Sequence, residues 1–119
     1  MANKICTSIE QSKKLIELGI DVNTADFMWE YDCNKEIYWD KPTIIPIDDY
    51  IFVNDIPAWS LSALLEFINR NCYNISLNCS GAEWTVKFDD SETYHHITCD
   101  YSIDAVFEMI CWLLENKKL

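Results

Sequence analysis

The spacing of apolar residues predicts two helices in the first part of the chain. The first covers residues 8–18, and Thr7 and Glu10 have the spacing of a capping box at its start. Gly19 is placed to end this helix in the left-handed conformation. The second helix begins after Ser60, which is its expected N-cap. Its buried stripe repeats at helical spacing and comprises Leu61, Leu64, Leu65 and Ile68.

A third helix is predicted for residues 103–116, with Ser102 as its N-cap. Apolar residues cover more than half of its circumference, which is more than packing on one sheet face requires. Two arrangements would explain this surplus. Either the helix is wedged between layers, which we favour, or it contacts a second copy of the chain and forms a homodimer through residues 103–114. The edge that a second copy would contact carries Ala105, Met109 and Trp112.

Residues 27–40 predict a β-hairpin that turns at residues 33–35. The period of two places aromatic residues on one face and acidic residues on the other. Tyr38 then lies on the acidic face with Glu30 and Asp32, which share a face because they are two residues apart on a strand. The aromatic face comprises Phe27, Trp29, Tyr31, Ile37 and Trp39.

Three short strands are predicted at residues 75–79, 83–88 and 93–99, separated by turn-forming residues. They read as an antiparallel meander with one face exposed to water. Residues 43–53 are apolar, but Pro42 and Pro46 interrupt this part of the chain, which indicates an irregular or edge segment and not a central strand.

These elements predict an α+β fold in a single domain over residues 1–119. The expected structure is an antiparallel sheet of about five strands with three helices, in the order helix, hairpin, helix, meander, helix. The length suits one domain, and half of the residues are apolar, which is the composition of a packed globule.

The charge of the chain limits the classes of partner that it is expected to bind. There are 20 acidic and 9 basic residues, giving a formal net charge of -11. Such a field repels phosphate, so we do not expect direct binding of nucleic acid or of an anionic membrane. Solubility alone would explain the charge. The same field would also attract a basic protein partner.

The six cysteines are interpreted as reduced thiols in a cytoplasm. No C-x-x-C motif occurs, and the chain has enough apolar residues to form a core without disulfides. Charged residues stand where a signal peptide would need an apolar run, and no apolar stretch has the length of a membrane span.

A metal site is the first chemistry to consider, because His95, His96 and Cys99 lie within five residues of one another. Strand geometry argues against it. Adjacent histidines point to opposite faces, and His95 and Cys99 share a face but lie about 13 Å apart along the strand. We interpret all three as ordinary strand residues, and no cofactor is expected.

Aromatic residues among acids favour a protein-binding surface over a catalytic site. The residues selected for such a surface are Tyr38, Glu30 and Asp32 on the hairpin, and Trp112 and Met109 on the last helix. No arrangement of nucleophile, base and acid stands out, so an enzyme is not the favoured interpretation.

Four runs carry a resemblance to a known family. They are residues 10–21, Thr24–Asp26, Ile56–Leu65 and residues 104–115, of which Ile56-Pro-Ala-Trp-Ser-Leu-Ser-Ala-Leu-Leu65 is the most specific. Together they resemble a family of small uncharacterised proteins of gut Bacteroidales and of their phages and mobile elements. This resemblance implies a bacterial or phage cytoplasmic setting and brings no activity or site residue with it.

Two functional hypotheses follow. The first is a non-enzymatic acidic module that binds another protein. The alternative is a small enzyme or metal-binding domain centred on the strand that carries His95, His96 and Cys99.

Overall fold

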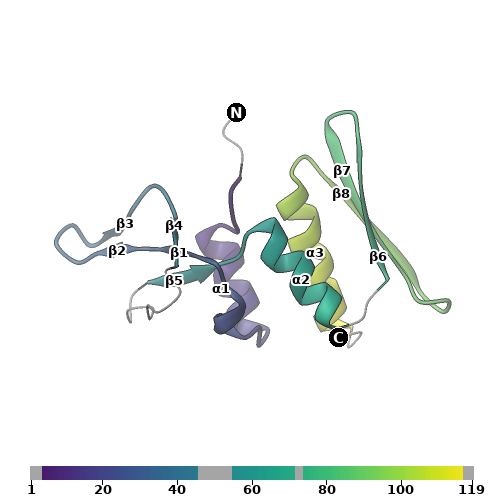
Figure 1. The fold of residues 1–119 in the computed structure, drawn as a ribbon, viewed down its shortest axis with the longest axis horizontal. Helices are drawn as coiled ribbons and strands as arrows, with labels where there is room; N and C mark the ends of the chain where they lie inside the picture. The colour runs from purple at the N-terminus through teal and green to yellow at the C-terminus, as the bar shows by residue number, and fades with distance from the viewer. Residues whose placement is uncertain (1–3, 46–54, 72–73, 117–119) are drawn as a thin grey trace. The chain divides into compact units, whose positions relative to one another are not determined.

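The computed structural model of the chain describes residues 4–45, 55–71 and 74–116. These residues contain three α-helices and eight strands, and all the strand pairs are antiparallel, which confirms the predicted α+β class and order of elements (Figure 1). The chain divides into two compact units. The N-terminal unit is Ile5–Ala63, and the C-terminal unit begins at Leu64 and includes Lys4. The predicted edge segment at residues 43–53 lies mostly outside the described residues.

Helix α1 (Ile9–Glu17) begins one residue later than its predicted capping box. The N-cap is Ser8, whose hydroxyl accepts a hydrogen bond from the Gln11 backbone amide at 3.1 Å, and the Gln11 side chain accepts one from the Ser8 amide at 2.9 Å. The predicted box of Thr7 and Glu10 is therefore wrong. The reason is that the hydroxyl of Thr7 is buried and bonded elsewhere.

The end of α1 is confirmed at Gly19, whose φ of +96° is in the left-handed region. The Gly19 amide donates to the carbonyl of Ile16 and the Ile20 amide donates to that of Leu15, so two carbonyls at the end of the helix find partners. Ile20 and Leu15 are both buried, which is the apolar contact that accompanies this motif.

The predicted long hairpin is two separate strand pairings. Strand β1 (Phe27–Trp29) lies in the centre of a small sheet, between β4 (Thr43–Ile44) and β5 (Ile56–Ala58). Beyond it, β2 (Tyr31–Asp32) pairs with β3 (Ile37–Tyr38). A short 3₁₀ helix, Val22–Thr24, precedes β1, and α1 contacts β5.

The hydrogen bonds of Thr7 hold the N-terminal unit together. Its amide donates to the carbonyl of Trp59 at 2.9 Å, and its hydroxyl accepts from the Trp59 amide at 3.0 Å. The hydroxyls of Thr7 and Ser12 share a hydrogen bond of 2.7 Å, and the Thr7 carbonyl accepts from the Trp29 indole at 3.0 Å. Thr7, Ser12 and Trp59 are fully buried. Every polar group of Thr7 is thus paired without water.

A second set of hydrogen bonds fixes the chain next to Trp59. The indole of Trp59 donates to the Thr24 hydroxyl at 2.9 Å. Asp26 accepts from both the amide and the hydroxyl of Ser60. The Ser60 hydroxyl in turn accepts from the amide of Ala63, in the first turn of α2 (Leu61–Arg70), so Ser60 caps this helix as predicted.

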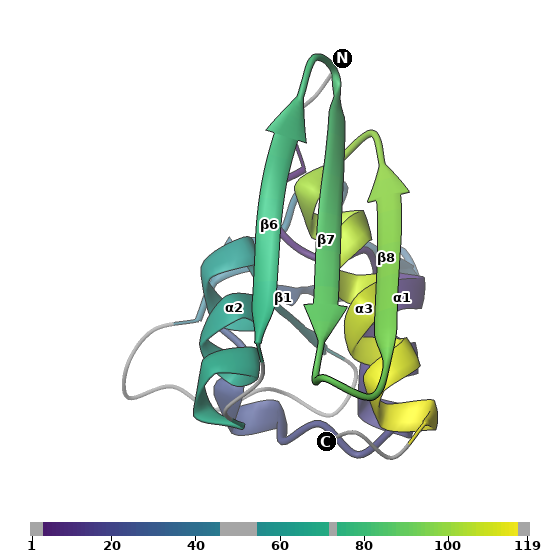
Figure 2. The ribbon, with the colours of Figure 1, turned by 90° about the vertical axis from the view of Figure 1, so that its right-hand side faces the viewer.

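The C-terminal unit contains residues 64–70 of α2 and a three-stranded antiparallel sheet with a further helix on one face (Figure 2). Its strands are β6 (Ile75–Ser80), β7 (Glu83–Asp89) and β8 (Tyr94–Cys99), and the predicted meander is confirmed. Helix α3 (Ser102–Glu115) contacts β7 and β8. The core between them comprises Val86, Phe88, Ala105, Met109 and Leu113.

Helix α3 begins one residue earlier than predicted, with Tyr101 and not Ser102 at its N-cap. Ala105 and Met109 face the sheet, and Ile103, Val106 and Ile110 are also buried. Two adjoining sides of the helix are therefore buried. Among the described helices, none has both the length and the apolar content needed to cross a membrane.

Replacing Thr7 by Val is expected to lower the free energy of unfolding by about 2 kcal/mol, because the buried Trp59 amide and Ser12 hydroxyl lose their partner. Thr7→Ser keeps the hydroxyl and is expected to lose less. Urea unfolding followed by tryptophan fluorescence measures both changes. Equal stability of Thr7→Val and the wild type would contradict the role given to Thr7.

Candidate protein-binding surface

Strand β8 places the two candidate metal-ligating histidines, His95 and His96, on opposite faces. His95, Ile97 and Cys99 are partly buried, whereas Tyr94 and His96 are exposed on the other face. The ring of His95 stacks on that of Trp112 in α3, with centroids 4.1 Å apart and an interplanar angle of 4°. His95 thus packs on the helix and His96 faces the solvent, as the alternation of a strand requires.

Cys99 lies beside an acid and not beside a base. Its thiol donates to the Glu108 carboxylate across a distance of 3.6 Å. Burial raises the pKa of the Cys99 thiol to about 11, and the negative charge of Glu108 acts in the same direction. A cysteine nucleophile needs the opposite environment, one that favours the thiolate. In the part of the chain that the structure describes, no group of three or more His, Cys, Asp or Glu residues could hold a metal ion.

The last helix does not supply the exposed residues selected for it. Met109 is fully buried in the core, so it does not belong to an interaction surface. Trp112 is partly buried between His95 and Phe88, whose ring centroid is 5.7 Å from its own. The edge of α3 that a second copy would contact is therefore occupied by the chain's own sheet.

The β2–β3 hairpin has a different register from the predicted one. Tyr31 is paired with Tyr38, and their rings meet edge to face with centroids 5.1 Å apart. Asp32 is paired with Ile37, and the Trp39 amide donates to the Glu30 carbonyl at 2.9 Å. Tyr38 is therefore half-buried on the aromatic side and does not share a face with the acids.

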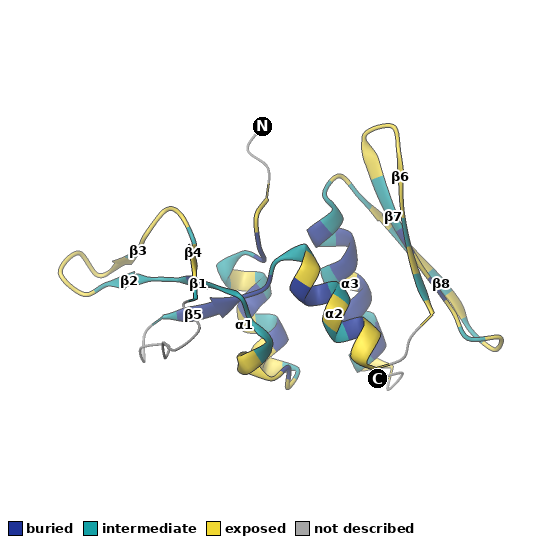
Figure 3. Cartoon of the chain, in the orientation of Figure 1, coloured by how far each residue is buried: buried dark blue, intermediate teal, exposed yellow. Residues whose placement is uncertain are grey.

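The side chains that share the acidic face are Trp39 and Ile37. Directly paired residues lie on the same face of a hairpin, so Glu30 and Asp32 flank these two residues. Trp39 is 51% exposed and Ile37 56% exposed, which is unusual for such large apolar side chains. Figure 3 shows this end of the N-terminal unit as exposed and half-buried. We call Glu30, Asp32, Ile37 and Trp39 the Trp39 face.

Local hydrogen bonds fix the shape of this hairpin. The Asp32 carboxylate accepts from the amides of Asn34 and Lys35, at 2.9 Å and 3.3 Å, which orders the turn. The Tyr31 amide donates to the Asp55 carboxylate at 2.9 Å, and the Thr43 hydroxyl donates to that of Glu30 at 3.1 Å. The acids of the Trp39 face, Glu30 and Asp32, are thus held in place and half-buried.

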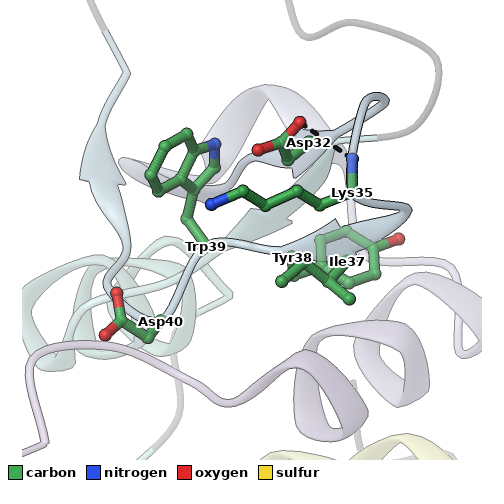
Figure 4. Close-up of a pocket in the computed structure, with 6 residues that line it drawn as sticks. All are labelled: Asp32, Lys35, Ile37, Tyr38, Trp39 and Asp40. Carbon is green, nitrogen blue, oxygen red and sulfur yellow. Dashed lines mark hydrogen bonds between the residues drawn. The ribbon is translucent and has the colours of Figure 1, made fainter.

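A hollow of about 290 Å³ opens on this hairpin. Figure 4 shows the Lys35 side chain lying across it, between Asp32 and Trp39, with its ammonium group on the side of Trp39. The residues that line the hollow are Asp32, Lys35, Ile37, Tyr38, Trp39 and Asp40. The ring of Trp39, the carboxylate of Asp32 and the aliphatic stem of Lys35 therefore meet at one small concave site.

Trp39 lies on the face opposite to the predicted one because the turn is longer than the three residues that the sequence pattern predicts. With a turn of residues 33–35, Asp32 would pair with Glu36, and Trp39 would share the face of Tyr31. The observed turn includes Glu36, whose φ is +55°, so Asp32 pairs with Ile37. A change of one residue in register moves every side chain to the other face. No glycine marks this left-handed position, so the residue types carry no signal for it.

Comparison with known proteins gives no match, whether to a family model, to a curated protein or to a solved structure. The function of this surface is therefore inferred from its geometry and charge.

Replacing His95 by Ala is expected to lower the free energy of unfolding by about 1 kcal/mol, because its stacking on Trp112 is lost. His96→Ala removes an exposed ring and is expected to change stability by less than about 0.5 kcal/mol. Thermal or urea unfolding of the two variants measures the difference. Equal losses would show that the His95 stack does not contribute.

Glu108→Gln is expected to speed alkylation of Cys99 by iodoacetamide at pH 9 by about threefold. The substitution removes a negative charge and so lowers the raised pKa of the thiol, giving more thiolate at this pH. Peptide mass spectrometry reports each cysteine separately, and Cys6 is the internal control. An unchanged Cys99 rate would mean that Glu108 does not affect the thiol.

Proposed function

We propose that this protein is a non-enzymatic acidic interaction module, of phage or mobile-element type, that binds a basic protein partner through the Trp39 face of its β2–β3 hairpin. The observation that carries the proposal is the exposure of Trp39 and Ile37 between the carboxylates of Glu30 and Asp32. Exposed aromatic residues bordered by polar ones are typical of protein-binding surfaces.

The charge of the chain supports a basic partner. A formal net charge of -11 speeds encounter with a positively charged protein and disfavours binding to phosphate. A DNA-binding protein is one class of basic protein that such a field would attract. Attraction of this kind weakens as the salt concentration rises.

A cytoplasmic setting belongs to the same proposal. Cys33 and Cys79 are exposed free thiols, which suit a reducing compartment. The resemblance to proteins of gut Bacteroidales and their phages supports this setting and suggests where a partner should be sought.

The test is a capture experiment from a gut Bacteroidales lysate with the tagged protein and a double variant, Ile37→Ser with Trp39→Ala. Both side chains are more than half exposed, so we expect the variant to fold. The wild type is expected to retain a basic protein at low salt and release it at high salt, and the variant should retain at least about tenfold less.

A matched control variant also loses two exposed apolar side chains, but at positions outside the β2–β3 hairpin. Ile44→Ser with Tyr94→Ala also removes two exposed apolar side chains, which are 70% and 58% exposed. This control should capture as much partner as the wild type. The proposal fails if the wild type retains no protein in a salt-dependent way, or if both variants lose it equally.

A further inference from the structure

The lining of the hairpin hollow has the chemistry of a site for a cationic side chain. The carboxylate of Asp32 and the ring of Trp39 lie beside the Lys35 stem, and Tyr38 and Asp40 complete the lining. A positive charge is attracted both by carboxylates and by the faces of aromatic rings, Trp most strongly. An anionic or a purely apolar group would gain from only a part of this lining.

The hollow is at the lower size limit of small-molecule sites and has room for one side chain. Sites for small molecules usually enclose roughly 300–1,000 Å³ and bury most of the ligand. The hairpin hollow measures about 290 Å³ and opens on the surface next to the half-exposed Trp39. One side chain of a partner could enter it while the rest of the partner contacts Ile37.

The protein's own Lys35 lies across this hollow (Figure 4). Its stem runs between Asp32 and Trp39, so the lining already accommodates an extended cationic side chain. The Lys35 amide is held by the turn through its bond to Asp32, whereas its side chain projects from that turn and has four rotatable bonds. A cationic side chain of a partner would therefore compete with the Lys35 ammonium group for the same position in the hollow.

We infer that the hollow lined by Asp32, Trp39 and Asp40 receives an arginine side chain from the basic partner, in the position across which Lys35 lies. Arginine is the cation of choice here because its planar guanidinium stacks on an aromatic ring and still donates to carboxylates at its edge. This inference rests on the proposed function and specifies its partner as an arginine-bearing segment.

The test measures the affinity of the full chain for two fluorescein-labelled peptides, hexa-arginine and hexa-lysine, by fluorescence anisotropy at two salt concentrations. The wild type is expected to bind hexa-arginine at least about threefold more tightly than hexa-lysine. Trp39→Ala is expected to weaken hexa-arginine binding about fivefold and to remove the preference for arginine. Tyr94→Ala, which removes an exposed ring elsewhere, should have no effect.

Lys35→Met gives the second, opposite prediction. It keeps the length of the side chain but removes the competing charge, so hexa-arginine binding is expected to strengthen about threefold. Lys87→Met removes the same charge from an exposed position on β7 and controls for net charge. Likewise Asp40→Asn should weaken binding more than Glu83→Gln, a substitution of another exposed acid.

The two proposals fail in different ways. If each hairpin variant binds hexa-arginine as its control does, the inference about the hollow is wrong. The capture experiment then still decides the proposed function, because it needs the Trp39 face but not an arginine in the hollow. A preference of the wild type for hexa-lysine would also overturn the inference.

Discussion

The paired hydrogen bonds between Thr7 and Trp59 are the interaction on which the N-terminal unit depends. They join residues 52 positions apart in the chain and set the strand β5 against the start of α1. The indoles of Trp29 and Trp59 then find partners at Thr7 and Thr24, and Asp26 fixes Ser60 at the start of α2. Two segments that are far apart in the sequence, Thr24–Asp26 and residues 56–60, therefore meet in this network.

The C-terminal unit uses its chemically versatile residues for packing. His95 stacks on Trp112, and Cys99 faces an acid that disfavours its thiolate. A histidine or a thiol on the inner face of a strand is thus accounted for by the helix that covers it. Among the described residues, Ile37 and Trp39 of the hairpin are large apolar side chains that stay more than half exposed, and the proposed function depends on them.

Local sequence patterns predict the elements of this fold that depend on neighbouring residues. They do not predict the pairings between residues that are far apart in the chain. The meander at residues 75–99, the cap at Ser60 and the helix end at Gly19 follow from residue types within a few positions. The role of Thr7 depends on Trp59, which no local pattern reveals, and the capping box was misplaced by one residue for this reason. In the Trp39 face, the shared face of Glu30 and Asp32 follows from the sequence. The sequence pattern places Trp39 on the opposite face of the hairpin. The left-handed conformation of Glu36 decides this assignment, and a glutamate gives no sign of it.

The turn of the hairpin has a consequence for how binding specificity could change. The cores of both units lie outside residues 33–36, so the length of this turn can vary at little cost to stability. Loss of one codon there would present Tyr38 beside the acids in place of Trp39 and Ile37. A protein built this way can exchange its whole contact surface in a single insertion or deletion, whereas point substitutions would have to replace each side chain in turn. Length variation in four residues is therefore the economical route by which such a module could follow a changing partner.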